Sequence, residues 1–446
     1  MVEGEAVIER KQNIHTIDDM PMTPFLWKVT IFSGGASFLD GYTLSLIGVA
    51  LVQLTAVLSL STEWAAAIGA AVLVGILVGT VLGGYVTDKL GRRPMFIFDL
   101  AAIVVLSILS AFITDAWQLL VIRFLIGVFI GADYPIATSM ITEFTPKDHR
   151  AISMGVVSAS WYLGATAAAF VGFFLIDMAN AWKILVASPA IPGILLLIGR
   201  SSIPESPMWL AKKGRVDEAE EILHEYVADD IDLQCKPSNE ATSYKKVFTS
   251  GYLGRIIFLG IFILCQVVPM YAIYTFGPDI MHAFGLDQGK QSILGESVVS
   301  LFFLLGTFPA MFALDKFGRR PVVMVSLFFM AVGLLILGLA STPTVIVIFV
   351  GFLLYALFSG GPGTLQWLYP NEMFPTEIRA TAVGIAIGFS RIGTIVSIYL
   401  TPVAIELYGV QFTMMIAAGL VILGLLLSFK FAPETKGKSL SETSQL

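Results

Sequence analysis

Long apolar stretches recur along most of the chain, and short polar segments separate them. A helix needs about 20 apolar residues to cross the hydrocarbon core of a bilayer. Runs such as MFIFDLAAIVVLSILSAFI lack the alternation of barrel strands, so the pattern predicts a polytopic helical membrane protein. Twelve stretches are long enough: 27–55, 64–87, 94–113, 117–144, 151–177, 183–200, 254–283, 291–313, 321–340, 344–370, 379–406 and 411–431.

The composition agrees with this class and excludes others. The 446 residues are 56% hydrophobic and 13% charged, whereas an average soluble domain carries about 25% charged residues. Too few charges remain to cover the surface of a soluble enzyme, and a disordered protein is excluded on the same ground. The net charge of −6 offers no basic footprint for nucleic acid.

The chain also offers little for covalent or metal chemistry. Cys235 and Cys265 lie in a polar and an apolar stretch, so we expect no disulfide between them. The four histidines are scattered without metal-ligand spacing, and we expect no metal, no cofactor and no catalytic residue. The acidic, polar N-terminus does not resemble a signal peptide.

Basic residues in the short loops predict the orientation. Lys89, Arg92 and Arg93 lie between the second and third stretches, and a matching basic cluster at 316–320 lies between the eighth and ninth. Cytoplasmic loops are enriched in Lys and Arg. We therefore expect a multi-pass protein of the cell membrane with both termini in the cytoplasm.

The predicted segments are an N-terminal tail (1–26), a six-helix bundle (27–200), a linker (201–252), a second six-helix bundle (253–431) and a C-terminal tail (432–446). Within the linker, GRVDEAEEILHEYV has helical periodicity. The linker either forms short cytoplasmic helices that join the two halves or is only a solvated connection.

Three signatures occur twice, 227 to 229 residues apart. Asp88-Lys-Leu-Gly-Arg-Arg-Pro returns at Asp315, Glu143-Phe-Thr-Pro returns at Glu372, and Pro204-Glu-Ser returns at Pro433. A shared offset predicts duplication of a six-helix unit. Six is even, so the halves have the same topology, and such parallel repeats hold a solute site near the bilayer midplane.

The repeated acids and arginines predict a charge network at the cytoplasmic end. It would bridge neighbouring helices while that end is closed and break when that end opens. The alternative is that the arginines only set the topology. The candidate gating residues are Asp88, Arg92, Arg93, Glu143, Arg150, Glu205, Asp315, Arg319, Arg320, Glu372, Arg379 and Glu434.

These motifs resemble those of the major facilitator superfamily. Gly84-(x)3-Asp88-Lys-Leu-Gly-Arg-Arg is similar to its loop signature, although Met311 replaces the first Gly in the second copy. Pro204-Glu-Ser-Pro and Gly361-Pro-Gly-(x)3-Trp367 resemble motifs of the sugar porter family and its metabolite-symporter relatives. The resemblance implies an all-α membrane protein with twelve transmembrane helices in two six-helix bundles that works by alternating access, and we expect a monomer.

The resemblance leaves the solute open. The sugar porters' span-seven string, QQxxGxN, reads Cys-Gln266-Val-Val-Pro-Met-Tyr271 here, so Tyr271 replaces a sugar-binding Asn, and their span-five Gln falls near Ser158. Asp40 and the string Gly-Ala-Asp133-Tyr-Pro resemble phosphate symporters and related anion carriers. We therefore expect a small polar metabolite, either an organic or inorganic anion or a sugar.

Further candidates for the solute site are polar or aromatic residues within the stretches. Besides Arg123, Arg391 is the cation expected at mid-depth, and it suits a carboxylate or phosphate. It either binds an anionic solute or holds a structural network, and the aromatic residues either line a cavity or pack between helices. The candidate substrate-binding residues are Ser158, Tyr162, Gln266, Tyr271, Tyr274, Trp367 and Arg391.

Two acids are expected near mid-depth, Asp40 and Asp133. Ionisable groups in hydrocarbon cost at least about 2.5–3.5 kcal/mol, so they usually face a cavity or a partner. A carboxyl group that alternates between dry surroundings and an arginine can take up and release a proton. We expect proton coupling at Asp40, Asp133 or both; the alternative is a permanent structural pair with Arg123. Asp99 is expected to be structural, and Glu296 to be an interface residue.

These features predict a proton-coupled symporter, with a passive facilitator of a sugar-like solute as the alternative. An intramembrane aspartyl protease has paired carboxylates, but Gly-Ala-Asp133 lacks the Gly-x-Gly-Asp string of that family. The sequence also lacks the GxxxxGK[ST] phosphate loop of a primary pump. We therefore expect a transporter rather than an enzyme, with the solute, protons and the lipid bilayer as its partners and no nucleic acid.

Overall fold

A computed structural model describes residues 21–145, 149–226, 252–286, 290–340, 344–374 and 376–436. Nearly all of these residues are helical. The first half contains α2 (Pro24–Val57), α3 (Thr62–Leu90), α4 (Arg92–Leu109), the 3-10 turn η2 (Ser110–Phe112), α5 (Ala116–Phe144), α6 (Arg150–Leu175), α7 (Ala181–Ala187) and α8 (Ala190–Ser201). The second half contains α12 (Leu253–Ala283), α13 (Lys290–Phe317), α14 (Arg319–Leu339), α15 (Val345–Met373) and α16 (Thr376–Phe431).

Local sequence explains where these helices begin and break. The side chains of Thr23, Ser61 and Thr344 accept hydrogen bonds from the first turns of α2, α3 and α15, as N-cap residues do. Pro189 separates α7 from α8, because proline lacks the N–H that a continuous helix needs. Gly409 interrupts α16 with φ of +85°, a conformation that glycine adopts without a steric penalty.

The predicted number of membrane spans is confirmed. Within the described ranges, eleven helical segments are long and apolar enough to cross a membrane, and α7 and α8 together form one of them, Ala181–Ser201. The last segment, Ile385–Phe431, contains the break at Gly409 and therefore supplies two spans. The fold is that of a twelve-helix membrane protein built from two six-helix bundles.

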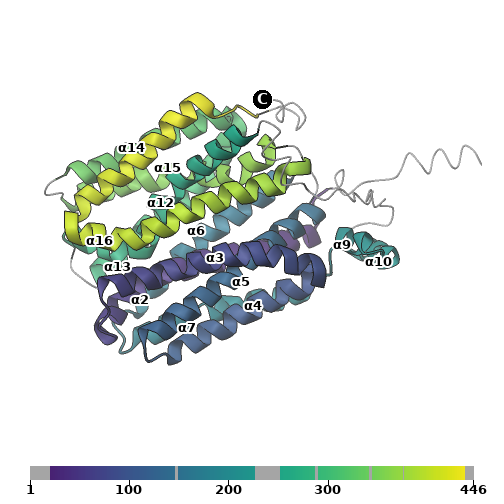
Figure 1. Cartoon of the computed structure of the whole chain (residues 1–446), viewed down its shortest axis with the longest axis horizontal. Coiled ribbons are helices and arrows are strands. Elements are labelled where there is room, and N and C mark those ends of the chain that lie inside the picture. Colours follow the sequence, from purple (N-terminus) through teal and green to yellow (C-terminus); the bar gives the residue numbers. More distant parts are fainter. Residues whose placement is uncertain are drawn as a thin grey trace, which may run out of the picture.

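Figure 1 shows the purple to blue helices of the first half in the lower part of the view and the green to yellow helices of the second half in the upper part. In the first half α2 packs mainly against α6, and α3 against α5; in the second half α12 packs against α16, and α14 against α15. The halves meet mainly through α6 with α13, α3 with α16, and α2 with α12, and α6 also contacts α15.

Glycines allow α3 and α5 to cross closely. A Cβ atom at Gly79 would lie 2.0 Å from the carbonyl oxygen of Val128, and one at Gly131 would lie 2.3 Å from that of Ile76. Small residues at helix interfaces let backbones approach in a membrane, where apolar burial alone does not drive helices together. We therefore expect larger residues at these positions to push α3 and α5 apart.

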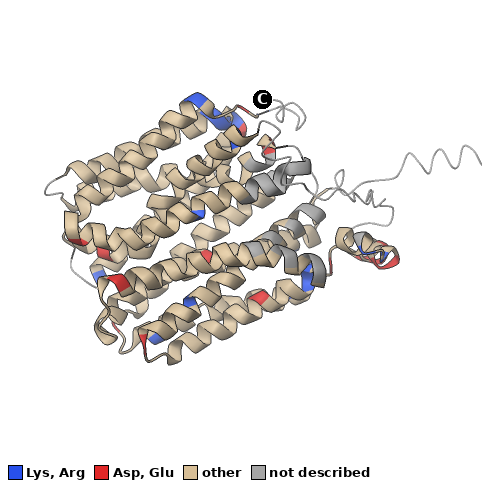
Figure 2. Ribbon diagram, viewed as in Figure 1, with Lys and Arg blue, Asp and Glu red and all other residues tan. Residues whose placement is uncertain are grey.

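The outer surface of the bundle fits a lipid environment. Large apolar side chains such as Phe174, Phe312 and Ile346 are more than 70% exposed, and exposed apolar surface on this scale indicates contact with a membrane. Figure 2 shows charged residues mainly at the helix ends, with a few inside the bundle. We call the end that holds the turns at Gly91 and Gly318 the basic end, and the other end the opposite end.

Two short helices occupy the part of the linker that the structure describes. They are α9 (Pro207–Lys212) and α10 (Val216–Tyr226), which project from the basic end (Figure 1). Helix α10 buries Ala219 and Leu223 and exposes its acidic face. The predicted short helices are therefore present, whereas residues 227–251 lie outside the described ranges.

Candidate functional site

Asp40 lies in the middle of α2 and is completely buried. One carboxylate oxygen, Oδ2, accepts hydrogen bonds from the hydroxyl of Tyr134 on α5 and from Nε1 of Trp161 on α6, the latter at 2.7 Å. The other oxygen, Oδ1, is buried and has no hydrogen-bond partner among the described residues. The carboxyl group is thus held in place but keeps one free oxygen.

The second half contributes Arg391 and aromatic rings to the same place. The Arg391 guanidinium lies 5.1 Å from the centre of the Tyr271 ring, and Arg391 is close enough to Asp40 for the two charges to interact. The Trp161 ring lies 5.6 Å from that of Tyr271. We call Asp40, Tyr134, Trp161, Tyr271 and Arg391 the central cluster; it joins α2, α5 and α6 to α12 and α16.

The remaining predicted solute residues surround this cluster. Tyr162 and Gln266 both approach the Met270 sulfur, at 3.4 and 3.5 Å, and Gln266 Oε1 is buried without a hydrogen-bond partner in the described ranges. Tyr274 packs 5.1 Å from Trp161, and Trp367 lies 6.0 Å from Tyr134. Ser158 is buried on α6, one helical turn before Tyr162. The fold therefore brings the predicted residues together from both halves.

Asp133 does not join the central cluster. It forms a bidentate ion pair with Arg200 of α8, with distances of 3.1 Å to Nη1 and 2.7 Å to Nη2. Asp99 of α4 lies 3.7 Å from the same guanidinium, which also donates to the Phe32 and Phe96 carbonyls. All three charged side chains are buried, and we call Asp99, Asp133 and Arg200 the buried charge cluster.

Arg123 forms no hydrogen bond or ion pair with Asp40 or Asp133 in the described part of the chain, although its charge is near enough to that of Asp40 for the two to interact. Arg123 is buried on α5 and donates to the Thr43 carbonyl at 2.8 Å, while its Nε and Nη2 have no hydrogen-bond partner in the described part of the chain. It lines a small cavity with Thr43 and Ser110. Asp133 of α5 pairs instead with Arg200 of α8, because α8 packs against α4 and α4 packs against α5.

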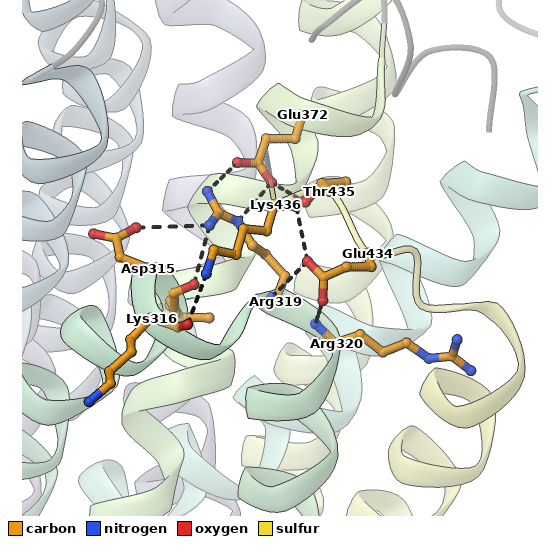
Figure 3. A network of polar contacts seen from close by, with 9 residues as sticks. Asp315, Lys316, Arg319, Arg320, Glu372, Glu434, Thr435 and Lys436 are labelled. Carbon is orange, nitrogen blue, oxygen red and sulfur yellow. Dashed lines mark hydrogen bonds and ion pairs between the residues drawn. The ribbon is translucent and has the colours of Figure 1, made fainter. Parts of the chain in front are cut away.

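The second copy of the repeated loop motif forms a network of polar contacts at the basic end. Figure 3 shows the Arg319 guanidinium between Glu372, at 2.8 Å, and Asp315, at 3.8 Å. Glu434 accepts hydrogen bonds from the backbone N–H groups of Arg319 and Arg320, each at 3.0 Å, and so caps the start of α14. Thr435 donates to Glu372.

Glu434 lies beyond the last span, and its ionisation fits this capping role. Burial alone would raise the pKa of Glu434, but the backbone N–H groups of Lys436, Arg319 and Arg320 and the Arg319 charge lower it below its ordinary value. The capping contribution to stability is therefore present above the ordinary pKa of a glutamate and is lost as pH falls through the lowered value.

The first copy of the motif repeats the cap. Glu205 accepts hydrogen bonds from the backbone N–H groups of Arg92 and Arg93, each at 3.1 Å, at the start of α4. The turn glycines, Gly91 and Gly318, have φ of +107° and +95°, and a Cβ on either would lie 2.7 Å from the capping carboxylate. The contacts described in each copy join helices of the same half. The side chains of Asp88, Glu143, Arg150 and Arg379 lie outside the described residues.

Four polar contacts between described residues join the two halves toward the opposite end. They are Ser45 with Glu296 at 3.3 Å, Thr62 with Glu406 at 2.8 Å, Thr166 with the Ser300 carbonyl at 3.0 Å, and Lys290 with Asp177. The halves are thus held together on that side of the central cluster. Glu296, which we expected at the interface near the outer end of its span, is instead 1% exposed and lies at the contact between the halves.

Sequence reasoning missed several residues of these clusters. Arg200 ends the last apolar stretch of the first half, and nothing in its sequence position indicates a buried cation. Tyr134 lies beside Asp133 in a motif already singled out, and Trp161 precedes the candidate Tyr162. Adjacency in the sequence was the available signal for these two aromatic partners, but their contact with Asp40 required the fold.

Two six-helix bundles that enclose a buried acid and a buried arginine define a membrane transport protein of the major facilitator fold. The chain belongs to the sugar (and other) transporter family, whose model matches residues 28–446. The protein therefore transports solute and is not an enzyme.

The relatives agree with this family. The chain is 46% identical over 435 residues to YaaU of Escherichia coli (strain K12), named as a metabolite transport protein, with 98% of each chain covered. It is 31% identical to the inner membrane metabolite transport protein YgcS of the same strain, with 94% of each covered. The proton:xylose symporter XylE from E. coli shares the fold at 23% identity, with a TM-score of 0.77 over 94% of this chain and 98% of XylE.

Proposed function

We propose that this protein is a proton-coupled symporter that carries a small polar metabolite by alternating access. The observation that supports this most directly is the central cluster, in which the buried Asp40 of one half lies near enough to the buried Arg391 of the other for their charges to interact. An ionisable group in hydrocarbon costs at least about 2.5–3.5 kcal/mol. A carboxyl group retained there despite this cost favours proton coupling over a passive facilitator.

The cluster offers a physical route to coupling. While Asp40 is ionised, its charge offsets that of Arg391, and an anionic solute has to compete for the guanidinium. When Asp40 binds a proton, Arg391 Nη1, which has no hydrogen-bond partner within the described ranges, is available to the solute. Proton and solute then strengthen each other's binding by the same factor, because binding linkage is reciprocal.

Alternating access follows from where the cluster lies. The ring contacts of Tyr134 with Trp367 and of Trp161 with Tyr271 cross from one half to the other. Rocking of one half against the other would separate these rings and expose Asp40 to one face of the membrane at a time. Asp133 is paired with Arg200 inside the first half, so we assign it a positioning role and assign the coupling proton to Asp40.

We assign the basic end to the cytoplasm, because Arg92, Arg93, Arg319 and Arg320 cluster there and cytoplasmic loops are rich in Lys and Arg. Both termini of the protein then lie on the cytoplasmic side of the cell membrane. The four contacts between the halves toward the opposite end close the protein on the outer side of the membrane. The networks around Glu205 and Glu434 would brace each half during rocking. The names of XylE, YaaU and YgcS support proton coupling and a metabolite as solute.

The test is transport by the purified protein in vesicles that contain a pH-sensitive dye. Aldopentoses, aldohexoses, small carboxylates and inorganic phosphate are each added outside as a gradient. We expect one solute class to acidify the vesicle interior faster than it acidifies protein-free vesicles, because each solute enters through the protein with a proton. Uptake of labelled solute without any pH change would contradict symport and favour the facilitator.

A substitution of Arg391 distinguishes an anionic solute from a neutral sugar. If the solute is an anion, Arg391→Gln should weaken its binding roughly 10- to 100-fold, since a hydrogen bond to a charged group contributes about 1.5–3 kcal/mol. Neutral sugars should bind almost unchanged, because their contacts would come from Gln266 and the aromatic rings. The measurement is the ligand concentration that gives half of the maximal rise in the temperature of thermal unfolding. Equal losses for anions and sugars would count against direct recognition by Arg391.

A further inference from the structure

Glu296 lies on α13 at the contact between the halves, apart from the central cluster. It is 1% exposed. Its Oε1 accepts hydrogen bonds from the hydroxyl of Ser45 on α2, at 3.3 Å, and from that of Ser300 on its own helix, at 2.8 Å. Its Oε2 is buried and has no hydrogen-bond partner in the part of the chain that the structure describes.

A bend in α12 makes room for this side chain. Phe276 leaves the helical conformation with φ of −123° and ψ of 25°, and Gly277 and Pro278 follow it. A Cβ atom on Gly277 would lie 2.2 Å from Glu296 Cγ. The acid therefore fills the space that the glycine leaves, and its carboxyl group lies between α2, α12 and α13.

The groups that face Glu296 do not neutralise a negative charge. Among the described residues no cation forms an ion pair with it. Helix α12 presents the phenol of Tyr274, α2 presents Ser45, and α6 presents Thr166, which is bonded to the Ser300 carbonyl. An ionised carboxyl group here would leave a charged oxygen dry and unpaired, whereas a protonated one leaves only a neutral hydroxyl.

We propose that Glu296 is a second proton-binding site, which holds a proton while the halves are closed toward the opposite end and releases it when that end opens. The inference rests on the proposed alternating access. On opening, Ser45 moves away with α2, water reaches the carboxyl group, and the carboxylate becomes solvated. Because the closed form binds the proton more tightly, low pH favours the closed form and high pH favours the open form.

The first test measures protonation directly and needs no solute. Infrared difference spectra of the purified protein in lipid nanodiscs are recorded between acidic and alkaline pH. We expect a carbonyl band of a protonated carboxyl group that is lost in Glu296→Gln. The band should remain in Glu63→Gln, a matched change of an exposed acid at the same end. A spectrum that is the same in wild type and Glu296→Gln would overturn the proposal.

A second variant guards against a folding defect in Glu296→Gln. Ser45→Ala keeps the acid but removes the donor that the first half places on its carbonyl oxygen. The band should then move to higher frequency, because a hydrogen bond to a carbonyl weakens the C=O bond. A band that does not move in Ser45→Ala would contradict the assignment to Glu296.

The second test follows the opposite end as pH changes. Spin labels at Val57 and Ile346, both exposed and placed in a background without Cys235 and Cys265, report the distance between the halves by pulsed electron spin resonance. We expect the population with the longer distance to grow with pH in the wild type and in Glu63→Gln. In Glu296→Gln the shorter distance should predominate at every pH.

The two proposals can fail separately. If the infrared band is lost in Glu296→Gln but no solute changes the pH inside vesicles, the Glu296 site stands and symport is rejected. Solute-driven acidification with no lost band, or with a distance response that Glu296→Gln leaves unchanged, would retain symport and reject the Glu296 site.

Discussion

Asp40→Asn is expected to abolish accumulation of the solute against its gradient. A membrane potential of 100 mV supplies about 2.3 kcal/mol per charge, which corresponds to roughly 40- to 50-fold accumulation of a neutral solute that enters with one proton. A monovalent anion that enters with one proton moves no net charge, so the pH gradient alone drives its accumulation, about tenfold per pH unit. The asparagine keeps acceptor capacity for Tyr134 and Trp161 but cannot take up the proton. Accumulation should therefore fall to about onefold, with exchange of solute between equal concentrations retained.

The measurement is uptake of labelled solute into vesicles under an imposed proton gradient, across a range of pH. The wild type should lose accumulation as pH rises on the side from which protons enter, and Asp40→Asn should show no such dependence. Asp217→Asn, an exposed acid in α10, is the matched control and should behave like the wild type. If Asp40→Asn accumulates the solute as fully as the wild type, Asp40 does not carry the coupling proton.

Arg200→Met is expected to destabilise the protein by about 3–5 kcal/mol, the range observed when one partner of a buried ion pair is removed. The methionine fills most of the space of the arginine stem but leaves the carboxyl groups of Asp133 and Asp99 without a cation. It also leaves the carbonyls of Phe32 and Phe96 without their donors.

Reversible unfolding in mixed detergent micelles measures this free energy. Arg215→Met removes the exposed ion pair with Glu218 and should cost at most about 1 kcal/mol, because exposed pairs contribute little. Adding Asp133→Asn to Arg200→Met should recover part of the loss, since the two residues are coupled. If Arg200→Met and Arg215→Met are equally stable, the buried charge cluster does not hold the first half together.

Much of the fold could be predicted from the chain alone because the bilayer imposes a simple rule. A segment must be apolar over the thickness of the hydrocarbon and must satisfy its backbone groups internally, so apolar length identifies helices. The twelve predicted stretches agree with the helices to within a few residues, including the separation of the last two at Gly409. The repeated Gly-Arg-Arg turns likewise become matching caps at Glu205 and Glu434.

The partners of buried charges were less predictable. Residue depth along a helix follows from sequence position, so Asp40 and Arg391 could be predicted to lie inside the bundle. The direction of a side chain and the length of its reach do not follow from depth. Arg200 ends its span yet reaches Asp133, and Glu296 lies near the end of a span yet is buried against Ser45 of the other half.

By itself the sequence determined the membrane class, the helix positions, the duplication and the polar residues that lie within the bilayer, because each depends on composition over short distances along one helix. Only the tertiary structure decided which acid meets which cation. Asp133 is neutralised within its own half, whereas Asp40 and Glu296 lie where the halves meet. These pairings depend on how helices far apart in the chain pack, and no local pattern of residues encodes that packing.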